Sequence, residues 1–297
     1  METGAASAGI CLIAGCGYAG TRLAHCLAER GPVLALVKSE ASAIRIQARE
    51  RIRAIQVDLD GAAAFPVPGD LGAVIYLVPP AGRDGEDGRF RRFLTALGGA
   101  RPRVLLYVST TGVYGDTGGA EVDEATPPAP GDDRARQRLD AEGQARRWAG
   151  ARGARCAILR VAAIYGPHRL PLDRLRRGEP VLRPEDTGPG NRIHVDDLVA
   201  ACAAILAGPA EGVFNLTDGC PWSLAELTER VAVLAGLPAP RRITQAEAGQ
   251  LLSPGFLAFF QASRRVLNCR MVETLGVAPR HPEVGIRQSL MEMGLPG

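Results

Sequence analysis

The sequence predicts an α/β fold, a doubly wound parallel sheet followed by a smaller and more irregular C-terminal portion. Short apolar runs alternate with helical patterns over about the first 160 residues, as expected of β-α units that build a parallel sheet. A turn with three glycines joins the first apolar run to the first helical pattern. Proline-rich loops interrupt the later chain. We therefore expect residues 1–165 and 192–218 to form the sheet domain, and residues 166–191 and 219–297 the smaller portion.

Short apolar runs bounded by turn residues predict the strands. These runs are residues 10–14, 33–37, 54–57, 73–78, 104–108, 156–159 and 213–216. The helices are predicted from apolar spacing and end signals, such as Leu23 and Leu27 on one face before Gly31-Pro32, and the capping box Ser223-Leu224-Ala225-Glu226. Their expected ranges are residues 21–30, 90–97, 132–149 and 223–236, with another helix opening at 191–197.

Composition excludes several classes of protein. The net charge of +3 gives no case for nucleic-acid binding, and no apolar run approaches the roughly 20 residues of a membrane-spanning helix. The seven cysteines form no C-x-x-C pair, so neither a metal site nor a disulfide framework is expected. Residues 1–9 have no basic segment typical of a signal peptide. We expect a cytoplasmic protein that acts on a small molecule.

The glycine-rich turn has the spacing G-x-G-x-x-G, with glycines at Gly15, Gly17 and Gly20. In a dinucleotide site the first glycine permits a tight turn and the second lets the backbone approach a pyrophosphate. The third lets the helix pack on the strand, with its free N–H groups facing the phosphates. The turn therefore predicts a Rossmann-type dinucleotide site formed by Gly15, Cys16, Gly17, Tyr18, Ala19 and Gly20.

The residues after the second strand bear on which dinucleotide binds. Lys38 and Ser39 stand where an NAD-selective fold carries an acid for the ribose 2′-hydroxyl, and a cation with a hydroxyl suits a 2′-phosphate better. We therefore expect NADP. NAD is the alternative, because the acid Glu40 stands close to the same position. Asp58 follows the third strand and is expected near the adenine amino group. Leu77, Val78 and Pro79 end the fourth strand, where open parallel sheets bind ligands.

These segments, in this order, resemble the extended short-chain dehydrogenase/reductases, in particular the NAD-dependent epimerase/dehydratase family and its atypical branch. The resemblance covers nearly the whole chain. Its landmarks are the glycine turn, Ser109-Thr110-Thr111-Gly112-Val113-Tyr114-Gly115, Val122-Asp123-Glu124, Arg160 with Ile164-Tyr165-Gly166-Pro167, and Arg192-Ile193-His194-Val195-Asp196-Asp197. The shorter glycine spacing departs from the G-x-x-G-x-x-G usual in extended members.

The resemblance implies catalysis by a hydroxyl, a tyrosine and a lysine. The hydroxyl falls on Thr110, which is expected to hydrogen-bond the substrate. The tyrosine and lysine normally form Y-x-x-x-K on the next helix, the lysine lowering the pKa of the tyrosine. Here Arg134 and Arg138 fall on those positions, no Y-x-x-x-K occurs, and Lys38 is the only lysine.

Arginine cannot exchange protons near neutral pH, because its pKa lies above about 12. We expect Arg138 to hold the nicotinamide ribose, as the family lysine does, and Arg134 to donate hydrogen bonds to a carbonyl or carboxylate. The alternative for both is a solvated helix arginine. The residues expected to line the substrate side, some as alternative proton donors, are Thr111, Tyr114, Tyr165, His168 and Arg192.

Two functions remain open. One is an NADP-preferring oxidoreductase or epimerase/dehydratase-like enzyme acting on a hydroxyl or carbonyl of a polar small molecule, for which the family favours a nucleotide sugar. The other is a catalytically silent NAD(P)-binding sensor or scaffold, which the missing Tyr/Lys pair favours. The resemblance also implies a homodimer through the helix that carries Arg134 to Arg147, although the positive charge of that helix argues against it.

Overall fold

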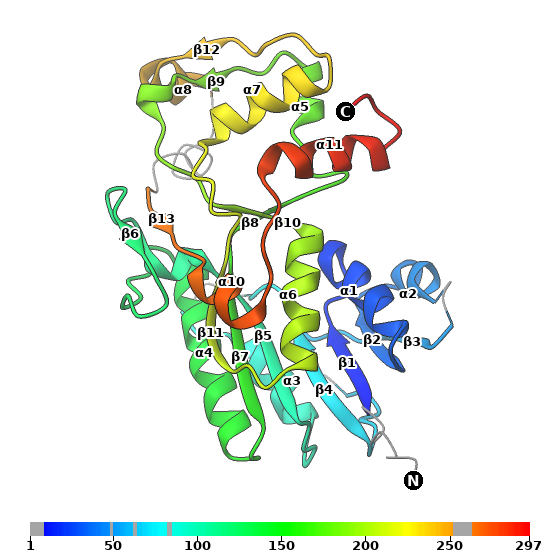
Figure 1. Cartoon of the computed structure of the whole chain (residues 1–297). Coiled ribbons are helices and arrows are strands. Elements are labelled where there is room, and N and C mark those ends of the chain that lie inside the picture. The colour runs from blue at the N-terminus through cyan, green and yellow to red at the C-terminus, as the bar shows by residue number, and fades with distance from the viewer. Residues whose placement is uncertain (1–8, 48–49, 62–63, 82–84, 252–262) are drawn as a thin grey trace.

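The computed structural model describes residues 9–47, 50–61, 64–81, 85–251 and 263–297. Seven strands form one sheet in the order β11-β7-β5-β4-β1-β2-β3, and every neighbouring pair is parallel. The strands are β1 (Ile10–Ala14), β2 (Val33–Val37), β3 (Ile52–Gln56), β4 (Leu71–Tyr76), β5 (Val104–Thr110), β7 (Arg155–Val161) and β11 (Gly212–Leu216). The predicted doubly wound parallel sheet is confirmed (Figure 1).

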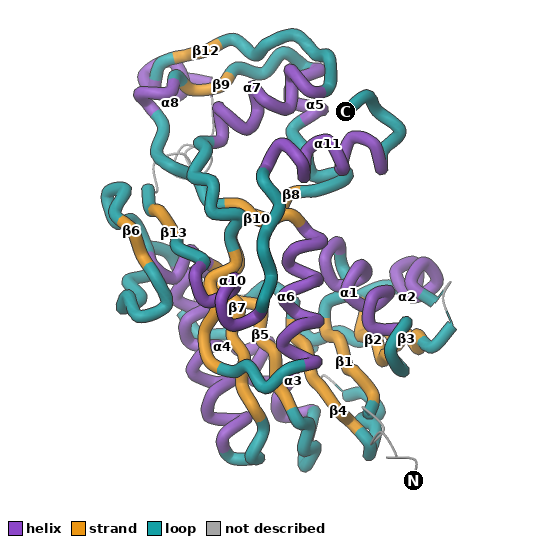
Figure 2. The backbone as a smooth tube through the Cα atoms, viewed as in Figure 1, coloured by secondary structure: helices purple, strands orange, loops and turns teal. Residues whose placement is uncertain are grey.

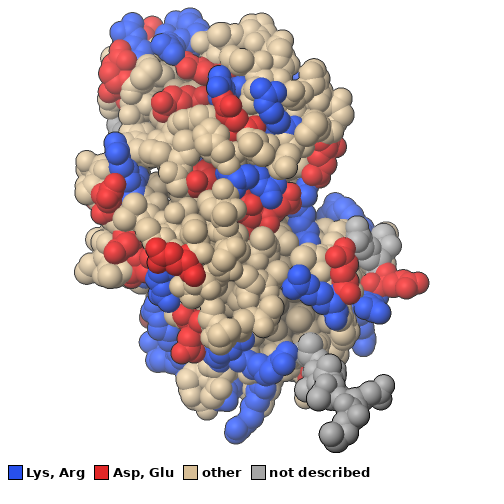
Figure 3. Space-filling model, viewed as in Figure 1, with Lys and Arg blue, Asp and Glu red and all other residues tan. Residues whose placement is uncertain are grey.

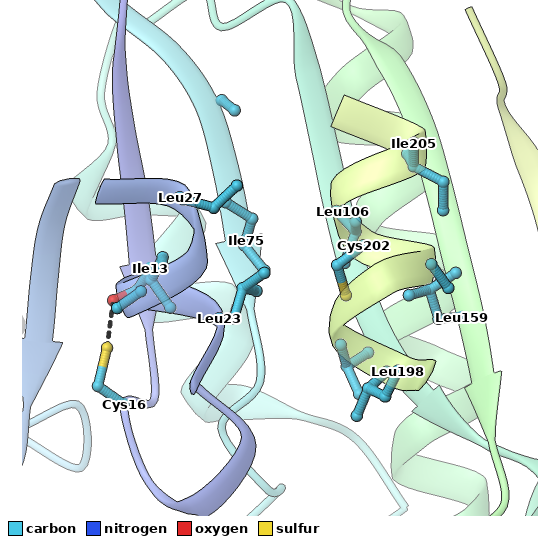
Figure 4. Packing of buried hydrophobic residues seen from close by; sticks show 14 of the residues in the cluster. Ile13, Cys16, Leu23, Leu27, Ile75, Leu106, Leu159, Leu198, Cys202 and Ile205 are labelled. Carbon is cyan, nitrogen blue, oxygen red and sulfur yellow. Dashed lines mark hydrogen bonds between the residues drawn. The ribbon is translucent and has the colours of Figure 1, made fainter. Parts of the chain in front are cut away.

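Helices cover both faces of this sheet (Figure 2). On one face α1 (Tyr18–Ala28) and α6 (Val195–Ala207) bury Leu23, Leu198 and Cys202 against strand residues such as Ile13 (Figure 4). On the other face α3 (Gly88–Ala96) and α4 (Asp133–Gly150) pack Phe90, Phe93 and Trp148 against the sheet. Each large apolar side chain that is fully buried contributes about 1.5–3 kcal/mol to the free energy of unfolding. The two cores therefore fix the positions of the strand ends.

A smaller portion lies above the C-terminal ends of the strands in Figures 1 and 2. Its apolar core joins α5 (Leu172–Arg176), α7 (Leu224–Leu234) and α11 (Pro282–Glu292), through Leu175, Val231 and Ile286 among others. β9 (Val181–Leu182) pairs with β12 (Arg242–Ile243), near α8 (Gln245–Leu251). The short 3-10 turn η2 (Pro184–Asp186) completes this portion.

Two parallel strand pairs lie outside the main sheet. β8 (Ala163–Tyr165) and β10 (Arg192–His194) pair at the waist between the two portions. β6 (Glu121–Val122) pairs with β13 (Arg265–Val266) at one side of the sheet domain. The 3-10 turn η1 (Thr111–Tyr114) follows β5 directly.

Several elements depart from the sequence prediction, three of them in or beside the sheet domain. Helix α2 (Glu40–Ile46) has no predicted counterpart, since only Ile46 of its seven residues is buried and the apolar period is weak. The segment before α6 is a strand, β10, because its backbone pairs with β8 rather than opening the helix. Helix α10 (Cys269–Leu275) returns to the sheet domain, where Met271 is fully buried in the core with α6 and β11. The predicted division at residue 219 assigns this segment to the smaller portion instead.

Candidate functional site

A cavity of about 730 Å³ lies at the C-terminal ends of the parallel strands. It surrounds the point where the strand order reverses, between β1 and β4, which is where doubly wound sheets bind ligands. The structure brings many predicted residues together here. Those that line the cavity are Gly15, Cys16, Gly17, Tyr18, Ala19, Gly20, Lys38, Asp58, Leu77, Val78, Pro79, Thr110, Arg134 and Arg138.

The three glycines of the turn differ in what surrounds them. Gly15 has a φ of +96°, a conformation that side chains rarely adopt. A Cβ on Gly20 would lie 2.3 Å from the carbonyl oxygen of Gly15, so the close approach of α1 to the turn requires glycine there. A Cβ on Gly17 would meet nothing within 4 Å. The fold therefore requires glycine at positions 15 and 20. At Gly17 the missing side chain instead leaves open space in the cavity.

Helix α1 begins beside this turn without a side-chain cap. Its first-turn N–H groups and the positive end of its dipole are therefore available to an anion in the cavity. Cys16 does not compete for that role. Its thiol donates to the carbonyl of Ile13 (3.7 Å; Figure 4), and burial raises the pKa of Cys16 to about 12, so it remains protonated.

The end of the cavity near β2 and β3 carries Lys38 and two charged residues that the sequence did not single out, Asp60 and Arg89. Lys38 Nζ lies 3.6 Å from the carboxylate of Asp60, and Asp60 also accepts from Arg89 Nε at 2.7 Å. The bond from Arg89 lowers the pKa of Asp60. Asp60 and Arg89 both line the cavity. Ser39 does not, because its hydroxyl caps α2 by accepting from the N–H of Ser42, which lines the cavity instead.

Thr110 ends β5 at the junction of two cavities. It lines the large cavity and also a second one of about 220 Å³, which contains Thr111 and Arg192 of the predicted substrate side. The hydroxyl oxygen of Thr110 accepts from the N–H of Gly112 at 3.1 Å. That bond occupies a lone pair and leaves the O–H proton available for a ligand.

The two arginines of α4 have different surroundings. Arg138 Nη1 donates to the carbonyl oxygens of Val78 (3.2 Å) and Val108 (2.9 Å) and to the hydroxyl of Tyr107 (3.2 Å). It thereby joins the chain just beyond β4 to strand β5. Arg134 is exposed at the cavity, and its guanidinium has no hydrogen-bond or ion-pair partner among the described residues. Arg134 is consequently available to a ligand, whereas Arg138 is largely engaged by the protein.

A buried ionic network lies directly behind Thr110. Ser109 Oγ donates to Glu142 at 2.7 Å, and Arg160 donates to both carboxylate oxygens of Glu142 at 3.1 and 2.9 Å. The side chains of Glu142 and Arg160 are 0% and 4% exposed. The network therefore joins β5, α4 and β7 and holds the end of β5 that carries Thr110.

Three residues expected on the substrate side lie outside both cavities. Tyr114 is buried, and its hydroxyl donates to Asn215 Oδ1 at 2.8 Å. Tyr165 is packed in the core of the upper portion against Gly285. His168 is an exposed loop residue with a φ of +62°, whose backbone N–H donates to the sulfur of Met293. In the structure these residues serve packing and a turn. The spacing of the motifs alone does not distinguish such positions from positions in the pocket.

Comparison with known proteins agrees with this geometry. Residues 90–217 match the model of the NAD dependent epimerase/dehydratase family. A conserved protein of unknown function from Silicibacter pomeroyi shares 30% identity over 96% of this chain and 99% of that chain, with a TM-score of 0.83. No curated protein matches the chain by sequence.

Two solved epimerases share the fold at lower identity. The UDP-glucuronic acid 4-epimerase from Bacillus cereus, solved in complex with NAD, is 16% identical over 94% of this chain and 96% of that one (TM-score 0.75). The UDP-glucose 4-epimerase from Thermotoga maritima, solved with UDP-glucose, is 17% identical over 96% and 98% (TM-score 0.77). Across the described residues, no helix combines the length and apolarity needed to span a membrane.

Proposed function

Because the chain belongs to the NAD-dependent epimerase/dehydratase family, we propose that it is an NAD(P)-dependent enzyme. It would be an oxidoreductase or an epimerase-like enzyme that acts on a hydroxyl or carbonyl group of a polar small molecule. The observation that carries the proposal is the open space at Gly17, beside an uncapped helix start, in a 730 Å³ cavity that ends at Thr110. Room for a pyrophosphate beside Gly17 and a hydroxyl at the end formed by Thr110 fit a dinucleotide and its substrate. The relatives that bind NAD and UDP-glucose have the same fold.

Each lining group has a physical role in this proposal. The N–H groups at the start of α1 would bind the pyrophosphate, and Asp58 would accept from the adenine amino group. When bound, the nicotinamide supplies or accepts a hydride at the substrate carbon. Thr110 donates a hydrogen bond to the substrate oxygen, and Arg134 stabilises the negative charge that develops there. Since arginine neither releases nor accepts a proton near neutral pH, the proton would be exchanged with water at the exposed side of Arg134, which gives it when a carbonyl is reduced and takes it when a hydroxyl is oxidised.

Cofactor choice follows from the charges beyond β2. We propose NADP, because the cations Lys38 and Arg89 outnumber the single carboxylate of Asp60 that they contact. The Lys38→Asp variant should lower the affinity for NADPH about tenfold relative to NADH, since it places two carboxylates where a 2′-phosphate would lie. Competitive fluorescence titrations at low and high salt measure the ratio. Arg53→Asp, an equal charge change at an exposed residue outside this cavity, is the control. An unchanged NADPH/NADH ratio in Lys38→Asp would show that Lys38 does not contact the phosphate.

Arg134 is the side chain on which turnover should depend most clearly. Replacing it with alanine removes one stabilising donor, which costs on the order of 10²-fold in kcat. Cofactor affinity should stay within about twofold of wild type, because Arg134 is assigned to the substrate oxygen. Arg136→Ala is the matched control, since Arg136 is exposed on the same helix, pairs with Asp133, and does not line the cavity. Equal kcat values for the two variants would exclude the assigned role.

A second function is a catalytically silent NAD(P)-binding sensor or scaffold. It is favoured by Arg138, which occupies the position of the family lysine but is engaged by two carbonyls and a tyrosine. Single-turnover assays separate the two functions. Protein loaded with NADPH is mixed with sugars, nucleotide sugars and ketones, and nicotinamide absorbance is followed. Oxidation with any substrate class supports the enzyme, whereas tight cofactor binding without oxidation supports the sensor.

A further inference from the structure

Two guanidinium groups line the second cavity without a carboxylate to neutralise them. Arg192 begins β10 at the waist of the molecule and is 6% exposed, and Arg264 precedes β13 and is partly buried. Within the described ranges, no carboxylate oxygen lies within 4.0 Å of either guanidinium. Buried charges in proteins are normally paired, because desolvation without a partner costs several kcal/mol per ion. Two cations without a neutralising carboxylate at one cavity are therefore unusual, and a bound anion would neutralise them.

The protein satisfies these groups only in part. Arg192 Nη1 donates to the carbonyl of Trp222, and Arg264 Nη1 donates to the carbonyl of Gly115. Among the residues that the structure describes, the buried Nε of Arg264 has no partner. A guanidinium carries five N–H donors, so most of the donors of the pair have no partner in this part of the chain. A Cβ on Gly190 would lie 3.0 Å from Nη1 and Nη2 of Arg192, which shows that the glycine leaves the room that this guanidinium needs.

The acids whose charges act on the two arginines are already bound to backbone amides. Asp218 accepts from the N–H of Cys220 at 3.0 Å, and burial raises the pKa of Asp218 to about 7, so it only partly neutralises Arg192 near neutral pH. Glu226 accepts from Ser223 in the capping box of α7. Near Arg264, Asp116 accepts from the N–H groups of Gly118 and Ser263, and Asp132 caps α4. Burial lowers the pKa of both arginines, but a guanidinium is so strongly basic that both remain cations.

The size and position of the cavity limit what the cations can bind. Its volume of about 220 Å³ is below the roughly 300–1,000 Å³ of sites for drug-sized ligands. Thr110 lines both this cavity and the cofactor cavity, so a ligand seated here would meet the cofactor at that residue. Guanidinium groups bind carboxylates and phosphates through paired N–H donors. The occupant must be compact, anionic and adjacent to Thr110.

We propose that Arg192 and Arg264 form an oxyanion subsite, which selects a compact hydroxy or carbonyl compound that carries a carboxylate or phosphate. The anion would lie between the two guanidinium groups and the reacting carbon at Thr110. Only the placement of the reacting carbon depends on the function proposed above. Binding of the anion at the subsite does not depend on turnover.

Matched monosaccharides test the charge requirement. Calorimetric titration compares glucuronate, glucose 6-phosphate and glucose, which share a six-carbon sugar and differ in the carboxylate, phosphate or neutral group at carbon 6. We expect glucuronate, glucose 6-phosphate or both to bind at millimolar concentration or tighter, and glucose at least tenfold more weakly. Which anion binds better identifies the source of the oxyanion. Equal binding of glucose, or no binding of either anion, overturns the proposal.

Variants connect the binding to the two arginines. Arg192→Gln and Arg264→Gln should each weaken binding of the favoured anion at least tenfold, and Arg265→Gln, the exposed neighbour on β13, should leave it unchanged. Arg264→Lys keeps the charge and should retain part of the affinity. Without anion, Arg264→Gln should unfold at the same temperature as wild type or higher, since a poorly paired charge is removed. Retained affinity in both Gln variants, or a lower unfolding temperature with unchanged affinity, would assign the arginines to structure.

Cofactor binding by the same protein distinguishes failure of the anion subsite from failure of the proposed NAD(P)-dependent function. Binding of NADPH is followed by nicotinamide fluorescence in the absence of sugar. Anion binding without cofactor binding would leave the subsite standing and remove the proposed function. Cofactor binding together with tight UDP-glucose binding, but without binding of either free anion, would overturn the subsite and identify a nucleotide sugar as the occupant.

Discussion

The Gly17→Val variant is expected to lose at least 100-fold in affinity for NADPH and NADH while folding as wild type does. A Cβ added at this position would meet no heavy atom within 4 Å apart from its chain neighbours, so we expect the folded state to have room for a small side chain. The added methyl groups would instead occupy the space beside the start of α1 that the pyrophosphate requires. A 100-fold loss corresponds to about 2.7 kcal/mol of binding free energy. Fluorescence titration measures the affinity, and circular dichroism with thermal unfolding measures the fold.

Gly20→Val is the matched control for that experiment. Its Cβ would lie 2.3 Å from the carbonyl oxygen of Gly15, a contact that backbone atoms cannot relieve without moving α1 away from β1. This variant should therefore lose stability as well as binding. If Gly17→Val binds NADPH as tightly as wild type, the pyrophosphate does not lie at the turn. If it unfolds like Gly20→Val, the role assigned to the open space is also wrong.

Glu142→Gln is expected to lower the free energy of unfolding by about 3 kcal/mol, the largest stability effect predicted for a single polar group here. The substitution leaves the buried guanidinium of Arg160 without its counter-charge, and it weakens the bond from Ser109. Urea denaturation at pH 7 measures the change. Because the network supports the end of β5, hydrogen bonding by Thr110 should weaken in the same variant.

Asp133→Asn on the same helix is the control for Glu142→Gln. Asp133 pairs with Arg136 at the surface, where both side chains are about half exposed, and such pairs contribute about 0–1 kcal/mol. The two variants remove one carboxylate each from α4, so a shared change in helix charge cancels in the comparison. Similar losses of stability in both variants would show that burial of the ionic network contributes little.

The sheet could be predicted because its strands are encoded locally. Runs such as residues 33–37 are apolar at every position, and the structure buries all five of these residues. The glycine turn was equally readable, since backbone conformation at Gly15 and close packing at Gly20 depend on residues a few positions apart. In contrast, α2 and β10 depend on pairing and packing that no local period records.

Residues of the candidate site could be predicted only where the motif also sets the direction in which the side chain points. Thr110 lies at the end of a strand whose alternation positions it, and it lines both cavities. Tyr114 follows four residues later in the same motif, yet it turns into the core to meet Asn215, which is 101 residues away. Asp60, Arg89 and Arg264 join the cavities through tertiary contacts alone, and no sequence signal marked them.

Titration of the purified wild-type protein with NADPH and NADH decides whether the large cavity binds a nicotinamide dinucleotide. We expect saturable binding of one dinucleotide per chain, enhanced nicotinamide fluorescence, and tighter binding of NADPH than of NADH. Saturable binding of neither nucleotide would contradict this prediction.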